Sequence, residues 1–242
     1  MQRQLILDVG NTSLRYALFE GDVLLRSALH THDALYVAFE EHIINVDRCF
    51  MATVAPDVAA RWLKRLALPC PVTTLHHSDI PLRNHTSAPE RVGIDRLINA
   101  YAAYRKSGGA IVVDAGSAIT WDVVSPAGEF LGGAIAPGPG LSLRALHAYT
   151  ERLPDVPVPS HLPETPLGRS SEEAILSGVA YGMLGMIAEV TRRLADELDF
   201  SPSLYLTGGY GVLIKEELGK LGYVHDENLT LRGIALAGAA LS

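Results

Sequence analysis

The sequence predicts an α/β protein built from two similar lobes. A strand that ends in Asp-x-Gly, followed by a polar turn and two further strands, begins near residue 5 and again near residue 111. Asp114 follows Asp8 by 106 residues, and Gly116 follows Gly10 by the same distance. The segments that connect these units have mostly helical composition. A unit repeated in this way predicts two lobes of similar size, which we place at residues 1–110 and 111–242.

Composition sets the broad class of the protein. The chain has 242 residues, of which 48% are hydrophobic and 19% charged, so it can bury a sizeable core. Its net charge of -7 disfavours a surface for nucleic acid or for anionic membranes. Two cysteines cannot form a disulfide framework, which favours a reduced, cytoplasmic setting. We find no apolar run of the roughly 18 residues that a spanning helix needs, and no signal peptide.

The strands are predicted from apolar runs bounded by glycine and polar turns. We expect them near residues 5–9, 16–19, 23–25 and 49–54 in the first lobe, and near 111–114, 120–124, 130–131 and 204–207 in the second. The last of these runs into Gly208-Gly209, a glycine turn.

The helices are predicted from apolar periodicity and from their end signals. We expect them at residues 57–66, 94–104, 172–198 and 229–241. Ser170 and Glu173 fit a capping box at the start of the longest one. The glycines at 178, 182 and 185 could let another backbone approach this helix closely. Gly138-Pro139-Gly140 predicts a tight turn, and the prolines from Pro154 to Pro166 predict an extended crossover.

The two Asp-x-Gly turns could bind phosphate groups. A glycine turn between strands leaves backbone N–H groups free to point at an anion, and the hydroxyls of Thr12, Ser13 and Ser117 would add donors. The aspartate before each turn could hold a hydrated Mg²⁺. One such turn alone is more typical of an ordinary hairpin, but two with their acids in register favour phosphate binding. The common phosphate-loop and dinucleotide-loop patterns are absent from the sequence.

Gly93-Ile94-Asp95-Arg96 begins the amphipathic helix at 94–104. Phosphoryl transfer needs a carboxylate close to the attacking hydroxyl, and an adjacent arginine can hold an anionic group. An acid in the first turn of a helix is also favoured by the helix dipole, so spacing alone leaves both interpretations open. Ser171 could likewise bind a ligand or only complete the first turn of its helix.

Taken together, these motifs resemble those of type III pantothenate kinases, a family of the acetate and sugar kinase/Hsp70/actin superfold. The motifs are Asp8–Thr12, Gly93–Arg96, Asp114–Ser117 with Thr120, Gly132–Gly138, and Gly168–Ser171 with Glu173 and Ala174. Their order and spacing agree from residue 5 to about residue 240. The resemblance implies a duplicated actin-like, ribonuclease H-like ATPase fold with two lobes around a nucleotide cleft. A closely similar bacterial group carries the name Bvg accessory factor, with a proposed regulatory role.

The resemblance also implies an activity and a set of roles. The chain would phosphorylate pantothenate with ATP, the first step of coenzyme A biosynthesis, and would act as a homodimer. The phosphate loop would be Asp8, Val9, Gly10, Asn11, Thr12, Ser13, Leu14 and Arg15. Pantothenate would bind to Gly93, Ile94, Asp95 and Arg96, with Ser171 as a further contact. Asp95 would be the general base, Asp8 would hold Mg²⁺, Asp114 would hold K⁺ or NH₄⁺, and Ser117 would contact ATP.

Some positions depart from the family pattern, and three other functions stay open. Serine replaces the usual threonine at 117 and 171, Arg15 replaces a common lysine, and Thr86 stands where many relatives have tyrosine. The alternatives are another small-molecule kinase of the same superfold, a non-catalytic regulatory factor, and an ATP-driven chaperone or filament module. The intact aspartates at 8, 95 and 114 argue against the second alternative. The third would need further domains that 242 residues do not provide.

Overall fold

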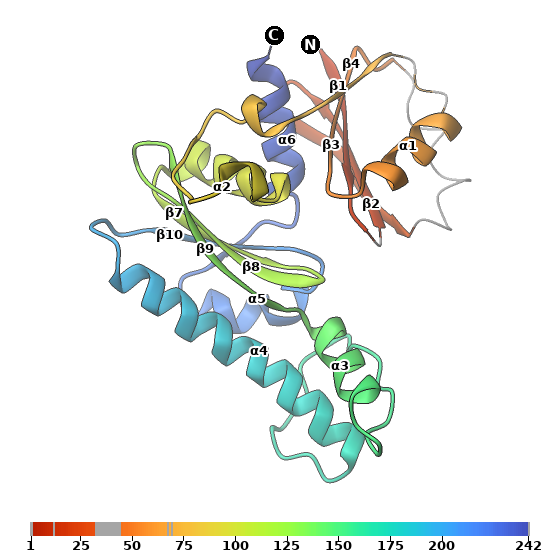
Figure 1. The fold of residues 1–242 in the computed structure, drawn as a ribbon, viewed down its shortest axis with the longest axis vertical. Coiled ribbons are helices and arrows are strands. Elements are labelled where there is room, and N and C mark those ends of the chain that lie inside the picture. Colours follow the sequence, from red (N-terminus) through yellow and green to blue (C-terminus); the bar gives the residue numbers. More distant parts are fainter. Residues whose placement is uncertain (1, 12, 32–44, 67, 69, 242) are drawn as a thin grey trace. The chain divides into compact units, whose positions relative to one another are not determined.

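The computed structural model describes residues 2–11, 13–31, 45–66, 68 and 70–241 (Figure 1). It is an α/β structure with two mixed β-sheets. The chain divides into two compact units, Met1–Ala102 together with Asn228–Ser242, and Ala103–Glu227. The second unit is therefore inserted, in sequence, between two parts of the first.

The first unit is built on a five-stranded sheet in the order β3-β2-β1-β4-β5. Its elements are β1 (Arg3–Val9), β2 (Ser13–Glu20), β3 (Val23–Thr31), β4 (Arg48–Thr53), α1 (Pro56–Arg65), β5 (Val72–Thr74), the 3-10 turns at His77–Asp79 and Pro89–Arg91, β6 (Arg83–Asn84), the start of α2 (Ile94–Ser107), and α6 (Leu229–Ala240). Leu5, Leu7 and Val9 of β1 pack on the side of α1. Because side chains alternate along a strand, Gln4, Ile6 and Asp8 lie on the other face, the face that α6 covers.

The second unit has its own sheet, whose strands follow the order β11-β10-β7-β8-β9. Its elements are β7 (Ala110–Ala115), β8 (Ala118–Val124), β9 (Glu129–Pro137), α3 (Pro139–Ala148), α4 (Ser171–Asp196), β10 (Ser203–Thr207), α5 (Gly211–Gly219) and β11 (Val224–His225). Ile111, Val113 and Ala115 pack with α4 and α5 in one core. Asp114 lies between Val113 and Ala115 on β7, so its side chain lies on the opposite face of the sheet. Thr207 is its neighbour on β10 and lies on that same opposite face.

The two sheets confirm the duplication that the sequence predicts. In each unit, the first strand pairs antiparallel with the second and parallel with the fourth, and the second pairs antiparallel with the third. The two units differ in the length of the turn that follows Gly10 and Gly116. Asp8 lies opposite Arg15, seven positions later, whereas Asp114 lies opposite Thr120, six positions later. The second turn is thus one residue shorter than the first.

The predicted helices are present, with boundaries that differ by a few residues. Ser170 caps α4, because its side chain accepts a hydrogen bond from the Glu173 backbone N–H at 3.1 Å. The Glu173 carboxylate accepts from the N–H of Arg169 at 2.7 Å, so the return bond of the expected capping box is displaced by one residue. The predicted turn at Gly138–Gly140 is instead the start of α3, with Gly138 at the N-cap and Pro139 in the first turn.

The last helix differs from the predicted division into lobes. That division places α6 in the second lobe, but α6 packs on β1, β4 and β2 of the first unit. Two glycines allow this close packing. A Cβ on Gly238 would collide with the ring of Phe50, and one on Gly233 would collide with Ile98.

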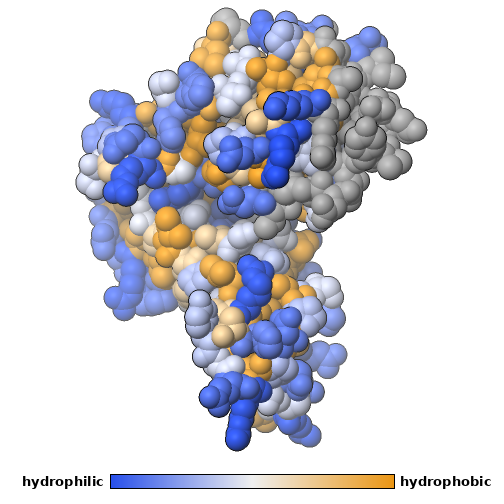
Figure 2. Space-filling view, turned by 45° about the vertical axis from the view of Figure 1, so that its right-hand side comes forward, coloured by the Kyte–Doolittle hydropathy of each residue, from blue (hydrophilic) through white to orange (hydrophobic). Residues whose placement is uncertain are grey.

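Among the described residues, α4 is the one helix long and apolar enough to cross a membrane by length and composition alone. A core helix of a globular protein passes the same test. One side of α4 carries buried residues such as Ala180, Met183 and Ile187, while Arg192 and Arg193 form ion pairs with Glu189 on its exposed side. The end of the second unit formed by α3 and the first turns of α4 also carries many hydrophilic side chains (lower part of Figure 2). We therefore interpret α4 as a packed helix of this unit.

Candidate functional site

The first Asp-x-Gly turn joins β1 to β2. Asp8 is half-buried near the end of β1, and Arg15 lies directly opposite it on β2. The turn closes through a hydrogen bond from the Gly10 N–H to the Ser13 carbonyl at 2.9 Å. Asn11 is exposed at its tip, and Thr12 lies outside the described residues. The turn therefore presents a carboxylate, a guanidinium and an exposed asparagine at one end of the strand pair.

The second turn repeats this arrangement between β7 and β8. The Gly116 N–H donates to the Ala118 carbonyl at 3.0 Å, and Ser117 is exposed at the tip. The Ser117 carbonyl accepts a hydrogen bond from the Gly138 N–H at 3.0 Å, and a Cβ on Gly138 would collide with the carbonyl of Gly116. The glycine at 138 thus lets the end of β9 pass directly behind the turn.

Thr207 and Gly208 complete the surroundings of Asp114, and sequence reasoning did not assign them a role. Thr207 lies beside Asp114 in the parallel pairing of β10 with β7. The Thr207 side chain is fully buried, and its hydroxyl has no hydrogen-bond partner in the described part of the chain. Gly208 has φ of +89°, and a Cβ there would collide with the Asp114 carboxylate. The sequence signal for these two residues is the Thr-Gly-Gly run at 207–209, which ends a predicted strand.

Asp95 lies in the first turn of α2 and is half-buried. Its Oδ1 accepts a hydrogen bond from the Arg96 backbone N–H at 3.0 Å. Burial raises the pKa of the Asp95 carboxyl above its ordinary value, although that hydrogen bond and the charge of Arg96 act in the opposite direction. A carboxylate with a raised pKa is a stronger base, which suits a group that removes a proton from an alcohol.

Gly93 precedes Asp95 and must be small. A Cβ at this position would collide with Asp95 Oδ1, so the glycine makes room for the carboxylate. Thr86, the position where many relatives have tyrosine, directs its hydroxyl to Asn84 Oδ1 at 2.8 Å. Its backbone N–H donates to the same oxygen at 3.0 Å, so this side chain serves the local turn.

Ser171 is exposed in the first turn of α4. The segment before it follows the helix closely, because Ser177 Oγ donates to the Pro166 carbonyl at 2.6 Å and Tyr181 OH donates to the Pro163 carbonyl at 2.7 Å. A hollow of about 540 Å³ lies in this region, with Gly168, Arg169 and Glu173 in its wall. The proline-rich crossover predicted from the sequence is therefore tied to α4 by side-chain hydrogen bonds.

The predicted site residues fall into two groups. The first unit holds the turn from Asp8 to Arg15 and the Gly93–Arg96 segment. The second unit holds Asp114, Ser117 and Ser171. Within the second unit, the structure brings Asp114 together with Thr207 and Gly208.

No cluster of three or more His, Cys, Asp or Glu side chains suited to a metal occurs among the described residues. A Mg²⁺ site for phosphoryl transfer does not need such a cluster, since the ion uses one or two carboxylates together with water and substrate phosphates. Burial raises the pKa of the Cys49 thiol to about 12, which disfavours the reactive thiolate form at neutral pH.

Comparison with known proteins places these features in a family. The family model for type III pantothenate kinase matches residues 4–193. A type III pantothenate kinase from Solibacter usitatus is 34% identical over 249 residues, covering 96% of this chain and 94% of that protein. One from Paramagnetospirillum magneticum is 32% identical over 248 residues, covering 95% and 94%. One from Anaeromyxobacter is 43% identical over a shorter stretch of 151 residues, 61% of this chain and 58% of that protein.

Solved structures agree on the fold. A protein from Campylobacter jejuni described as a Baf family transcriptional activator matches with a TM-score of 0.60 and 22% identity, covering 96% of both chains. MreB5 from Spiroplasma citri matches with a TM-score of 0.53 and 10% identity, covering 100% of this chain and 97% of that one. These likenesses show an actin-like α/β fold, as the sequence motifs imply. The matches to the family model and to near full-length relatives show that the chain belongs to the type III pantothenate kinase family.

Proposed function

We propose that this chain transfers the γ-phosphoryl group of ATP to the primary hydroxyl of pantothenate, which gives 4′-phosphopantothenate and begins coenzyme A biosynthesis. Membership of the type III pantothenate kinase family makes the chain a kinase and names its acceptor. The observation that carries the proposal is the duplicated strand–Asp–x–Gly unit, because each copy presents a carboxylate and a turn with an exposed polar residue at the end of a strand.

In this mechanism, the two turns hold the phosphates of ATP. Backbone N–H groups and hydroxyls of the first turn, with the charge of Arg15, would bind the phosphate oxygens. Asp8 would hold Mg²⁺, and the ion would supply positive charge that offsets the negative charge of the phosphates. The Ser117 hydroxyl, exposed at the tip of the second turn, is free to reach a phosphate.

Asp95 would act as the general base. Its carboxylate would accept the proton of the pantothenate hydroxyl as that oxygen attacks the γ-phosphorus, and the bond to the leaving ADP oxygen would break in line. Arg96 would bind the pantothenate carboxylate, since a guanidinium suits a carboxylate geometrically. Ser171 would add a hydroxyl contact to the substrate. The raised pKa of Asp95 supports the role of base.

Asp114 would hold the monovalent cation, K⁺ or NH₄⁺. The residues around it fit such an ion, because a half-buried carboxylate lies beside a buried hydroxyl that lacks a partner, and both offer oxygen ligands. We propose Thr207 as a ligand that completes this site. The bound cation would supply positive charge near the phosphates.

We also propose that the enzyme is a cytoplasmic homodimer. Gly178, Gly182 and Gly185 lie on one side of α4, are exposed, and would have open space around an added Cβ. This surface would let a second copy approach closely. Both cysteines are free, which suits a reduced compartment.

The test is ADP release from Mg-ATP by the purified chain, with and without pantothenate, in K⁺ and again in Na⁺. Pantothenate-dependent release that is faster in K⁺ supports both the activity and the cation. Release stimulated by another acceptor in a substrate panel, and not by pantothenate, would identify a different small-molecule kinase. No nucleotide turnover with any acceptor would favour the non-catalytic regulatory alternative.

A further inference from the structure

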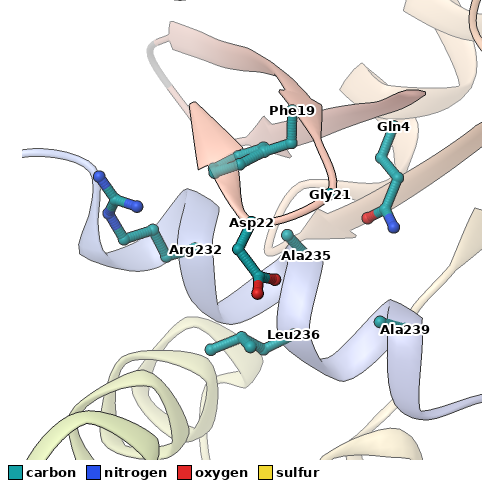
Figure 3. A pocket seen from close by; sticks show the side chains of 8 residues that line it. All are labelled: Gln4, Phe19, Gly21, Asp22, Arg232, Ala235, Leu236 and Ala239. Carbon is teal, nitrogen blue, oxygen red and sulfur yellow. The ribbon is translucent and has the colours of Figure 1, made fainter. Parts of the chain in front are cut away.

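A hollow in the first unit lies between α6 and the sheet, at the end of the β2–β3 hairpin (Figure 3). Its volume is about 200 Å³. Most of its wall is apolar and comes from Phe19, Ala235, Leu236 and Ala239. Its polar groups are Gln4 of β1, Asp22 of the hairpin turn, and Arg232 at the start of α6.

The hollow follows from the way α6 packs. Gly238 lets the helix approach the ring of Phe50 on β4, as described above. The residues that α6 turns toward β1 and β2 in this region, Ala235 and Ala239, are too short to fill the remaining space. Short side chains opposite a buried aromatic ring therefore leave an apolar recess.

Gln4 gives this recess its chemical character. Its side chain is 9% exposed and forms no side-chain hydrogen bond with any other described residue. Its amide atoms still reach solvent in the recess, so they are available to a ligand that enters it. An amide offers one acceptor and one donor group side by side, and another amide matches this pair reciprocally.

Asp22 adds a preference among polar ligands. It is exposed at the mouth of the recess and takes part in no ion pair within the described residues. Figure 3 shows its carboxylate above α6, near Leu236, with Gln4 and Arg232 on opposite sides. Arg232 already has another interaction. A carboxylate there attracts N–H donors and repels an anionic head group.

The recess is separate from the kinase site. Gln4 and Asp8 lie on the same face of β1, but four residues of strand place their Cα atoms about 13 Å apart. The size of the recess limits its occupant. One water takes about 30 Å³ in the liquid, so the hollow suits a molecule of roughly six or seven non-hydrogen atoms.

We propose that this recess binds a small aliphatic carboxamide. Its alkyl chain lies against Phe19, Ala235 and Leu236, its amide pairs with the amide of Gln4, and its remaining N–H points toward Asp22. The proposal does not depend on the kinase activity.

The test compares three probes that share a four-carbon chain: butyramide, butylammonium and butyrate. Binding to the full chain is followed by ¹⁵N NMR, with the backbone N–H signals of Gly21, Asp22 and Ala239 as reporters, which every variant below retains. We expect saturable binding of butyramide, on the order of millimolar for so small a ligand, and at least tenfold weaker binding of butyrate. Absence of saturable binding by all three probes would overturn the proposal and leave a recess that holds only water. Binding of butyrate as tight as that of butyramide would also overturn it, because the recess would then not select an amide.

Two variants separate the contributions. Ala235→Leu should fill the recess and abolish butyramide binding, while Ala240→Leu, on the same helix but outside the wall, should leave binding unchanged. Gln4→Leu keeps a similar size and should remove the preference for butyramide over butyrate. Thermal unfolding checks that each variant is folded, and the Ala235→Leu result stands if Gln4→Leu does not fold. Butyramide binding that survives Ala235→Leu would contradict the proposed location. Pantothenate-dependent ADP release, measured in parallel, reports on the proposed kinase function independently.

Discussion

Replacing Thr207 with valine removes a hydroxyl that has no partner within the described structure and changes the side-chain shape little. The hydroxyl is fully buried beside Asp114. Leaving a buried hydroxyl unpaired costs about 1–3 kcal/mol, and valine carries no group to satisfy. We therefore expect Thr207→Val to increase the free energy of unfolding by that amount when no cation is bound. For a chain of this size, each 1 kcal/mol raises Tm by about 2–4 °C.

Potassium should reduce this advantage. A bound ion at one hundred times its Kd stabilises the native state by about 2.7 kcal/mol. If Thr207 is a ligand, we expect its loss to weaken cation binding by roughly tenfold or more, which lowers that stabilisation by about 1.4 kcal/mol at the same K⁺ concentration. Thermal unfolding across a K⁺ titration, with Na⁺ at constant ionic strength, measures both effects without any need for turnover.

The control is Thr207→Ser, which retains the hydroxyl and should retain the response to K⁺. Two results would refute the reasoning. A Thr207→Val variant that is less stable than the wild type without K⁺ would mean that the hydroxyl has a stabilising partner in the native state. Equal stabilisation of wild type and Thr207→Val by K⁺, with loss of the response in Asp114→Asn, would keep the cation at Asp114 but remove Thr207 from its ligands.

Four further predictions concern three other site residues. Asp95→Asn should lower kcat by about 100-fold or more with the fold retained, because the base is lost; near wild-type turnover in a steady-state assay would exclude Asp95 as the base. Burial raises the pKa of Asp95, so the native state binds the proton of this carboxyl more tightly than the unfolded state does. The native state therefore loses stability as pH rises from the ordinary aspartate pKa to the raised pKa of Asp95. Asp95→Asn should therefore be more stable than wild type at pH 7, with the difference vanishing below the ordinary aspartate pKa; denaturant unfolding against pH measures this. Asp8→Asn should raise the Mg²⁺ concentration for half-maximal rate by about tenfold, and an unchanged Mg²⁺ dependence would reject that role. Gly208→Ala should destabilise the protein by at least 1–2 kcal/mol, the approximate cost of a left-handed conformation, and unaltered thermal unfolding would contradict the φ of +89°.

The duplicated unit could be predicted because its signal is local. Apolar runs, the Asp-x-Gly turns and the common spacing of Asp8 and Asp114 all lie within short stretches of sequence. The family motifs that include Asp95 and Ser171 are similarly short. Local sequence is therefore enough to predict the fold and the candidate residues, and the roles of those residues stay predictions.

Features that depend on contacts between distant segments could not be predicted in this way. The glycine-rich run at Gly138–Gly140 predicts a turn, but it is the start of α3, and proline is well suited to the first helical turn. The Thr207 hydroxyl lacks a hydrogen-bond partner among the described residues because of how β10 pairs with β7, which local sequence does not reveal. The one-residue difference between the two turns appears only in the strand pairing.

The path of the chain has a consequence for synthesis on the ribosome. The first unit takes its last helix, α6, from residues that are translated after the whole of the second unit. Leu229, Leu231, Ile234 and Ala237 of that helix are buried. Until they emerge, one face of the sheet that carries Asp8 has no cover, whereas the second unit already has all its residues. We therefore expect the N-terminal half of the nascent chain to mature last, contrary to the usual order in which domains fold as they are made.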